Sequence, residues 1–354
     1  SGGLDSSILA ALACRNLGAA QVHTFSARFT ARSYDESARA GQVAEWLGTR
    51  HTEVSCDEPD LLEAFDAMTD RCAQPLADPA LLPVYLLSRA ARREVRVVLS
   101  GEGADELFGG YPTYLGHHLA PAFLRLPALL RRGLAAGLGR LPSSGRKVTL
   151  EYLLKRFLAE AGRPWVERHL HWFGTGLLAG RENLCQAAFE AFFKEAGDSA
   201  ETALLLDYRT YLRDNLLVKV DRATMLNSIE ARAPVLDREV TAFALALPLD
   251  EKIRWLQGKR VLKQAAAAWL PSSILGRRKR GLSVPVADWL NGGLRSEVDR
   301  LLEPARLRRQ GLLDADRIQS LLSEHRARRA NHSRPLWAAL VLERFLDHWL
   351  PSAT

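Results

Sequence analysis

The chain has 354 residues, of which 47% are hydrophobic and 25% charged, and its formal net charge at pH 7 is +7. These values are typical of a soluble globular protein with one large domain or two ordinary ones. No window approaches 18 uncharged apolar residues, which argues against a membrane-spanning helix and a membrane partner.

The cysteines are few and widely separated. Their spacing contains no C-x-x-C pair and no zinc knuckle, which predicts reduced core thiols in a cytoplasmic protein. They are Cys14, Cys56, Cys72 and Cys185.

The positive charge is compatible with two kinds of ligand. It would attract anions such as ATP and pyrophosphate, and it would also attract nucleic acid through the basic clusters Arg277–Arg280 and Arg326–Arg329. Few aromatic residues lie among these cations. We therefore interpret the clusters as solvated faces and expect no nucleic-acid partner.

The chain opens on SGGLDSS (residues 1–7), which leads directly into a helical apolar pattern. Two adjacent glycines allow a sharp turn, and a helix start offers unpaired N–H groups to phosphate. A carboxylate such as Asp5 beside phosphates requires a divalent cation between them. The loop has no lysine and is not a Walker loop; the structural alternative is a Gly-Ser turn at a helix N-cap. We predict a phosphate site formed by Ser1, Gly2, Gly3, Asp5, Ser6 and Ser7.

The first 115 residues alternate between strand and helix patterns. Residues 22–29, 51–55 and the β-branched run 95–99 read as strands, the last as a buried parallel strand. Helical spacing recurs at 40–47, with Gly48 as a stop, and again at 61–68 and 82–89. This alternation predicts an α/β fold with an open parallel sheet, whose ligands bind at the carboxyl ends of its strands. The opening loop and the segment after Leu99 should then share one crevice.

That segment is SGEGADELFGGY (residues 100–111), with three acids among glycines. Such acids need a cation or a positive substrate nearby. Asp105 could join Asp5 on magnesium, and Glu102 is then available to handle a proton or an amine. The alternative is an acidic surface loop.

Strand patterns become scarce after Pro121, and we expect an all-helical C-terminal part that ends in a helix around Trp337–Phe345. Residues 121–145 are helical with proline breaks; we favour a buried helix pair over an amphipathic membrane-surface helix. We divide the chain into an α/β nucleotide-binding core (1–115) and a helical part that completes the same domain (116–354).

The two loops and three later stretches together resemble the synthetase domain of asparagine synthetases, within the ATP-pyrophosphatase (PP-loop) superfamily. The later stretches are KVDRATMLNSIEARAPVLD (219–237), GKRVLKQAAAAWLP (258–271) and RKRGLSVPVADWL (278–290). The resemblance covers nearly the whole chain. It implies an adenine-nucleotide alpha-hydrolase-like fold, ATP and Mg²⁺ as cofactors, and cleavage of ATP into AMP and pyrophosphate.

The resemblance also implies roles for individual residues. Lys259 would stabilise the departing pyrophosphate, with Lys279 as a second, weaker candidate. Glu102 would support formation and amination of an acyl-adenylate. The nucleotide contacts are Ser100, Gly101 and Ala27, where the family usually has Val or Ile.

Several charged residues have competing interpretations. Asp78, Asp105 and Arg232 are candidate substrate contacts, although Asp78 is explained equally well as a helix N-cap. The charged positions of the stretch 219–237 could form either the substrate shell or buried pairs that join two helices. They are Lys219, Asp221, Glu230 and Arg232.

The implied reaction is asparagine synthesis from aspartate and ammonia, the ammonia coming from glutamine. Two alternatives remain: an amide-forming relative of the β-lactam synthetase or peptide-cyclase type, and a tRNA-modifying ATP pyrophosphatase. A phosphate loop of this kind normally follows a strand, so we expect the given chain to be a fragment of a parent with a glutaminase domain. The oligomeric state is open, with a homodimer as one candidate.

Overall fold

The computed structural model describes residues 1–139, 150–173, 183–277, 281–282 and 284–350. Helices and strands alternate up to the acidic loop, and the strands and helices predicted there are confirmed. The predicted stop at Gly48 is a left-handed C-cap with φ of +70°. The elements in chain order are α1 (Leu4–Leu17), η1 (Ala19–Gln21), β1 (His23–Arg28), α2 (Ser37–Leu47), β2 (Arg50–Ser55), α3 (Glu58–Arg71), α4 (Leu81–Ala91), β3 (Val97–Leu99) and α5 (Ala104–Phe108).

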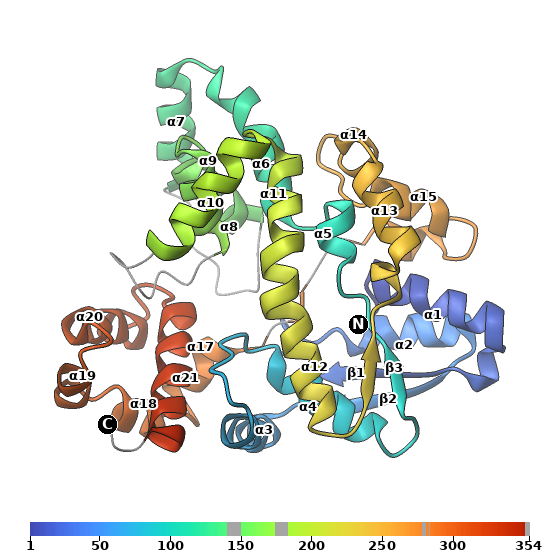
Figure 1. Cartoon of the computed structure of the whole chain (residues 1–354), viewed down its shortest axis with the longest axis horizontal. Coiled ribbons are helices and arrows are strands. Elements are labelled where there is room, and N and C mark those ends of the chain that lie inside the picture. The colour runs from blue at the N-terminus through green and yellow to red at the C-terminus, as the bar shows by residue number, and fades with distance from the viewer. Residues whose placement is uncertain (140–149, 174–182, 278–280, 283, 351–354) are drawn as a thin grey trace.

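The strands pair in parallel, as predicted, but not as one open sheet. β1 pairs with β2, and β3 pairs with β4 (Glu230–Arg232), so the described strands form two separate two-stranded sheets (Figure 1). The expectation of an all-helical C-terminal part is therefore wrong at β4. Three residues are too few to show a strand period in the sequence.

The prediction that β3 is buried is also wrong. Val97 and Leu99 are 42% and 52% exposed. Helices α2 and α4 pack on the β1–β2 pair, and a β-branched run reports only a preference for a strand, not the cover that the strand receives.

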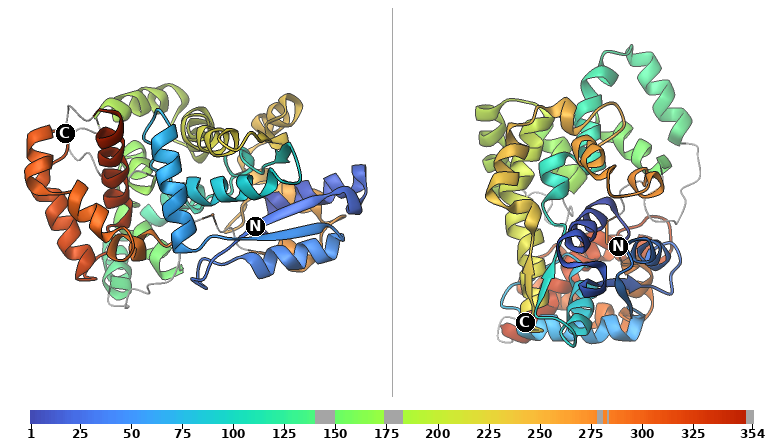
Figure 2. Two further views of the ribbon diagram at one scale, coloured as in Figure 1. Left: turned by 90° about the horizontal axis from the view of Figure 1, so that it is seen from below. Right: turned by 90° about the vertical axis from the view of Figure 1, so that its right-hand side faces the viewer.

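The remaining elements are almost all helical. A long column of α11, the π-helix η2 and α12 runs from the α6–α10 group to the β3–β4 pair (Figure 1), along one side of the molecule in the right-hand view of Figure 2. The elements are α6 (Pro112–Leu124), α7 (Ala128–Gly139), α8 (Leu150–Glu160), α9 (Trp165–Phe173), α10 (Asn183–Ala196), α11 (Ala200–Asp207), η2 (Tyr208–Leu217), α12 (Val218–Met225), η3 (Pro234–Leu236), α13 (Arg238–Ala246), α14 (Leu249–Lys252), α15 (Arg260–Ala266), α16 (Ser272–Leu275), α17 (Val286–Asn291), α18 (Arg295–Leu301), α19 (Pro304–Gln310), α20 (Ala315–Arg326) and α21 (Ser333–Trp349).

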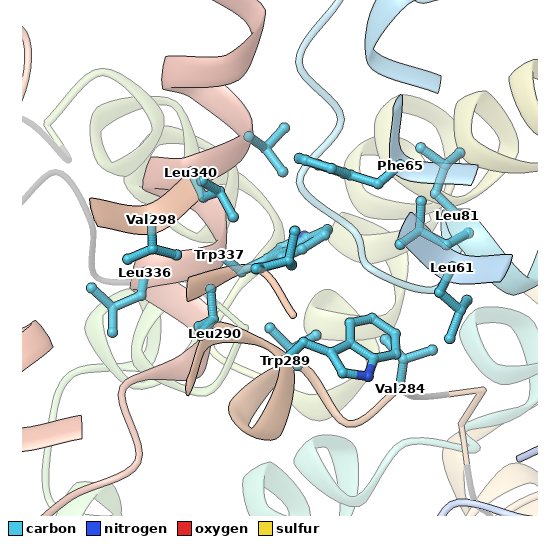
Figure 3. Close-up of a cluster of buried hydrophobic side chains, with 14 of the residues drawn as sticks. Leu61, Phe65, Leu81, Val284, Trp289, Leu290, Val298, Leu336, Trp337 and Leu340 are labelled. Atoms are coloured by element: carbon cyan, nitrogen blue, oxygen red, sulfur yellow. The ribbon is translucent and has the colours of Figure 1, made fainter. Parts of the chain in front are cut away.

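The largest apolar core of the described residues joins α3 and α4 to the C-terminal helices. Side chains of α3 and α4 meet those of α17, α18 and α21, and the rings of Phe65 and Trp337 lie 5.2 Å apart at its centre (Figure 3). The helix predicted around Trp337–Phe345 is thus confirmed as α21. Burial of this apolar surface, worth roughly 25 cal/mol per Å², holds the last helices against the α/β part.

Helix α7 contradicts the expectation of a buried helix pair. It packs against α8, yet Leu129 is 82% exposed and Leu130 and Leu134 are also exposed. The helical period alone does not tell which side of a helix is covered. Within the described ranges no helix is both long and apolar enough to cross a membrane.

The described cysteines are free thiols. These are Cys14, Cys56 and Cys72. Burial raises the pKa of Cys56 to about 12, so this thiol stays protonated at neutral pH. Cys185 lies in α10, but its side chain is outside the described part of the structure.

Candidate active site

The opening loop makes a tight turn into α1. Gly2 has φ of +63°, and a Cβ there would lie 2.6 Å from the backbone carbon of Arg39, so only glycine fits. The hydroxyl of Ser7 donates to the carbonyl of Gly3 at 2.6 Å, and the hydroxyls of Ser1 and Ser6 lie 2.8 Å apart. The loop is thus folded back on itself at the helix N-terminus, where backbone N–H groups and the helix dipole favour an anion.

The acidic loop lies directly against the opening loop. A Cβ on Gly101 would approach the Cβ of Asp5 to 3.0 Å. The backbone N–H of Ser100 donates to the carbonyl of Arg232 at 2.8 Å, which extends the β3–β4 pairing into the loop. The two motifs predicted to share a crevice are therefore adjacent in space.

Lys259 lies between the carboxylates of the two loops. Its Nζ is 2.5 Å from Oδ2 of Asp5 and 2.6 Å from Oδ1 of Asp105. All three side chains are largely buried, which strengthens charge-assisted hydrogen bonds of this kind. We call these three residues the Asp5–Lys259–Asp105 triad.

The backbone of Lys259 has a left-handed conformation and lies in close contact with the acidic loop. Lys259 has φ of +55°, a left-handed conformation that is costly for a residue with a side chain. Its N–H donates to the carbonyl of Phe108 at 3.1 Å. A Cβ on Gly258 would lie 2.2 Å from the carbonyl oxygen of Gly109, and one on Gly110 would lie 1.8 Å from Oδ1 of Asp105. The glycines of both motifs therefore let the two backbones touch and hold the lysine in place.

Glu106 and Tyr111 form a second buried group beside the triad. The hydroxyl of Tyr111 donates to Oε1 of Glu106 at 2.7 Å, and Glu106 is 2% exposed. Burial, followed by the nearby Asp105 carboxylate, raises the pKa of Glu106 to about 7. The ring of Tyr111 packs against Tyr114 and Tyr211, with centroids 5.5 and 6.3 Å away. A carboxyl group is thus held in an apolar, aromatic setting.

Asp78 and Lys219 form a third group, near Glu102 of the acidic loop. The Nζ of Lys219 lies 3.0 Å from Oδ2 of Asp78, and Asn215 donates to the same oxygen at 3.4 Å. Burial lowers the pKa of Lys219, but the carboxylates of Asp78 and Glu102 outweigh it, so the pKa is raised. The lysine therefore stays charged near Glu102. Asp78 also accepts a hydrogen bond from the backbone N–H of Ala80 at 3.0 Å. The N-cap of α4 is Ala80 itself, so the interpretation of Asp78 as the N-cap is wrong.

Other sequence-predicted site residues lie elsewhere. The side chain of Arg232 points to the surface and pairs with Glu230 at 2.7 Å, so the structure does not bring it to the triad. Ala27 is buried within β1. Asp221 is exposed on α12. Lys279 lies outside the described residues.

Arg277 supports the opening loop, although its sequence context indicated only a basic cluster. Its guanidinium donates to the carbonyls of Gly2 (2.9 Å) and Arg39 (3.3 Å) and to the side chain of Gln42 (2.8 Å). It thus holds the opening loop from behind. Nothing in the local sequence distinguishes this arginine from its neighbours, because these three partners lie far away in the chain.

The donor set of the triad fits magnesium. Mg²⁺ is bound in proteins by one or two carboxylates together with substrate phosphates and water. Asp5 and Asp105 supply two carboxylates that share one ammonium group. No cluster of three or more acidic, histidine or cysteine side chains suited to a metal occurs among the described residues, so further ligands would have to come from the substrate.

Comparison with known proteins shows which family this chain is similar to. Residues 1–350 match the family model described as asparagine synthase. A Mycobacterium tuberculosis protein named as a candidate glutamine-hydrolyzing asparagine synthetase is 35% identical over 96% of this chain and 52% of its own length. Glutamine-hydrolyzing asparagine synthetase 1 of Bacillus subtilis is 29% identical over 96% of this chain and 54% of its own. An amidase of Penicillium rubens is 23% identical over 92% of this chain.

The chain belongs to the asparagine synthase family. It spans about half the length of the curated relatives it matches.

Proposed function

We propose that the chain catalyses ATP-dependent synthesis of asparagine, through transfer of AMP to the side-chain carboxylate of aspartate and then amination by ammonia. The observation that supports this most is the Asp5–Lys259–Asp105 triad. It joins three motifs that lie far apart in the sequence, and it places one cation and two carboxylates where the opening loop would hold ATP phosphates.

In the first step a carboxylate oxygen of aspartate attacks the α-phosphorus of ATP, and the bond to pyrophosphate breaks. The opening loop holds the phosphates with its backbone N–H groups, and Ser100, Gly101 and Ala27 lie at the nucleotide. Lys259 stabilises the negative charge that develops on the pyrophosphate, with Lys279 as a second cation. A magnesium ion held by Asp5 and Asp105 would neutralise charge on the phosphates.

In the second step the nitrogen of ammonia attacks the carbonyl of the mixed anhydride, and AMP leaves. An amine that has attacked must lose a proton, and Glu102 is the carboxylate we assign to that proton. Asp78, paired with Lys219, is a candidate contact for the amino-acid substrate. The names of the relatives suggest glutamine as the source of the ammonia in the whole protein.

The products of ATP cleavage test this proposal. The full-length protein is incubated with ATP, magnesium, aspartate and ammonia, and the nucleotides and amino acids are separated. The proposal requires AMP, pyrophosphate and asparagine in equal amounts. ADP with phosphate would contradict it.

A second candidate keeps the adenylation step but changes the acceptor. The amidase name of the Penicillium relative is the observation that favours it, although the identity is only 23%. A panel of carboxylates, with product masses measured, separates the two. AMP formation that depends on a carboxylate other than aspartate would favour the alternative; AMP formation that depends on tRNA would favour an RNA-modifying enzyme instead.

A further inference from the structure

A chain of polar side chains runs through the interior of the helical part and is not used by the proposed chemistry. It joins α6, α9 and α11, and each member is no more than 2% exposed. We call it the buried polar chain. Its members are Arg168, His117, His169, Asp207 and Tyr114.

The hydrogen bonds of this chain can run in only one direction. Arg168 can only donate, so Nδ1 of His117 accepts from it at 3.3 Å. His117 must then carry its proton on Nε2, which faces Nδ1 of His169 at 3.2 Å. His169 in turn carries its proton on Nε2 and donates to Asp207 at 2.9 Å. Both histidines are therefore neutral, with a cation at one end and a carboxylate at the other.

The Asp207 end of the chain meets the aromatic group beside the triad. The hydroxyl of Tyr114 donates to the second oxygen of Asp207 at 2.7 Å. The ring of Tyr114 packs on Tyr111, whose hydroxyl holds Glu106 next to Asp105. Asp207 is also the last residue of α11, just before the π-helix that carries Tyr211 against the same Tyr111 ring.

Burial of such a chain is costly, and each link stabilises the groups that it joins. Each of its polar atoms loses water, and a broken link leaves a buried donor or acceptor without its partner. A single arrangement of α6, α9 and α11 satisfies all the links at once. Tyr114 is therefore held at a fixed position relative to the acidic loop that follows β3.

We propose that the buried polar chain is a positioning network for the active site: through Asp207 and Tyr114 it fixes Tyr111 and Glu106, and thereby the acidic loop that carries Asp105. None of its members is among the residues assigned above to ATP, magnesium or the acceptor. The effect on turnover rests on the proposed function, whereas the effect on the loop does not.

Two substitutions of His169 separate the ends of the chain. The amide of a glutamine reaches about as far as Nε2, so His169→Gln can still donate to Asp207. The amide of an asparagine reaches only the position of Nδ1, so His169→Asn keeps the His117 side and loses the Asp207 side. Both substitutions remove the imidazole, and both leave the triad untouched.

Two measurements are made on the full-length protein. Hydrogen exchange of the backbone in residues 104–111 reports the loop directly, and steady-state kinetics report kcat and KM for ATP. For His169→Asn we expect faster exchange in 104–111 and kcat lowered about tenfold, with KM for ATP changed less than about twofold. His169→Gln should recover most of both losses.

A matched control lies in another helix. His325 of α20 is also buried and bonded on both ring nitrogens, to the carbonyl of Ala287 and the N–H of His332, each at 3.2 Å. His325→Gln should leave exchange in 104–111 and kcat unchanged. Equal behaviour of the two His169 variants, or unchanged exchange in 104–111 for His169→Asn, would overturn the proposal.

Tyr114→Phe covers the case in which the His169 variants do not fold, since it keeps the ring and removes only the bond to Asp207. It should speed exchange in 104–111, and unchanged exchange there would overturn the proposal. If the unsubstituted protein makes no asparagine, the proposed function fails, and the exchange data still decide the positioning role.

Discussion

Lys259 combines two features that rarely coincide in one residue. It has a left-handed backbone, and its buried ammonium group is shared between two carboxylates. Strain of this kind costs roughly 1–3 kcal/mol and persists only where the surroundings enforce it. Here the close approach of Gly258 to the backbone of Gly109, and of the Asp105 and Lys259 side chains to Gly110, enforces it.

The first prediction concerns that ammonium group. Lys259→Ala should lower kcat by about two to three orders of magnitude while ATP affinity changes little, because the charge is needed mainly as pyrophosphate leaves. Turnover and the dissociation constant of ATP are measured separately. Lys263→Ala, one helical turn away, is the control and should retain most activity. Equal losses in affinity and turnover for Lys259→Ala would make Lys259 a ground-state anchor of ATP.

The second prediction separates Asp105 from Glu102. Asp105→Asn should be partly restored by a higher magnesium concentration, because an amide is a weaker ligand than a carboxylate. Glu102→Ala should not be restored, since its assigned role is in proton transfer. Turnover is measured across a magnesium titration. Restoration of both variants, or of neither, would show that the two roles are assigned wrongly.

The third prediction concerns pH and His117. Burial, followed by the neighbouring imidazole of His169 and the charge of Arg168, holds the pKa of His117 well below its usual value. Below pH 6.5 the unfolded chain therefore takes up a proton that the folded protein does not, and stability falls as the pH falls. The groups around His117 are Arg168 and His169 on α9, Tyr114 on its own helix, and Asp207 on α11 through His169.

The size of this effect can be isolated by substitution. One such proton is worth about 1.4 kcal/mol per pH unit below the unfolded pKa. Denaturant unfolding of the wild type and of His117→Gln at pH 7.5 and 5.5 gives the difference that belongs to this side chain and its partner His169, since histidines outside the buried polar chain contribute equally to both. The wild type should lose more stability than the variant on acidification. An equal loss would show that His117 titrates normally.

At the scale of elements, the site depends on close contact between α5 and the start of α15. Glycines at the ends of both helices remove the side chains that would keep the two backbones apart. Arg277 and the β3–β4 pair then hold the two loops from behind. The active-site residues are therefore carried by backbone that is fixed on several sides.

The fourth prediction compares two glycines. Gly110→Ala would place a methyl group 1.8 Å from Oδ1 of Asp105 and 2.2 Å from Cε of Lys259. It must separate the ion pair, and we expect turnover to fall at least about 100-fold. A Cβ on Gly133 in α7 meets nothing within 4 Å, so Gly133→Ala should stabilise its helix by up to about 1 kcal/mol and leave turnover unchanged. Full activity of Gly110→Ala would contradict the geometry of the triad.

At the scale of the whole molecule, the largest core is built from α3, α4 and the C-terminal helices. α21 packs against α3 through the Phe65–Trp337 contact. The C-terminal helices are thus an integral part of the fold that carries the site.

The fifth prediction tests that core. Trp337→Ala should lower the free energy of unfolding by about 3–5 kcal/mol, because Trp337 is 3% exposed. Trp46 on α2 is 61% exposed, and Trp46→Ala should cost no more than about 0.5 kcal/mol. Denaturant unfolding measures both. Similar losses for the two variants would show that α21 is not held by this contact.

Much of the first 111 residues could be predicted from the sequence, because strand and helix periods and the Gly48 stop are local signals. The division of the strands into two sheets and the exposure of β3 and α7 could not be predicted. Whether a strand finds a second neighbour, or a helix a cover, depends on residues far away in the chain. Arg232 illustrates the same dependence. Its side chain is exposed beside Glu230 because no distant segment covers this face of β4 in the described part of the structure.

The sequence by itself determined the chemical inventory: two glycine-rich loops, their carboxylates and a later lysine motif. Tertiary structure alone decided that Lys259 lies between Asp5 and Asp105, that Arg277 supports the opening loop, and that a chain of buried polar groups ends beside Glu106. The physical reason is one of range. Backbone conformation and periodicity are set by neighbours a few residues apart, whereas ion pairs and buried hydrogen bonds are set by partners that only packing brings together.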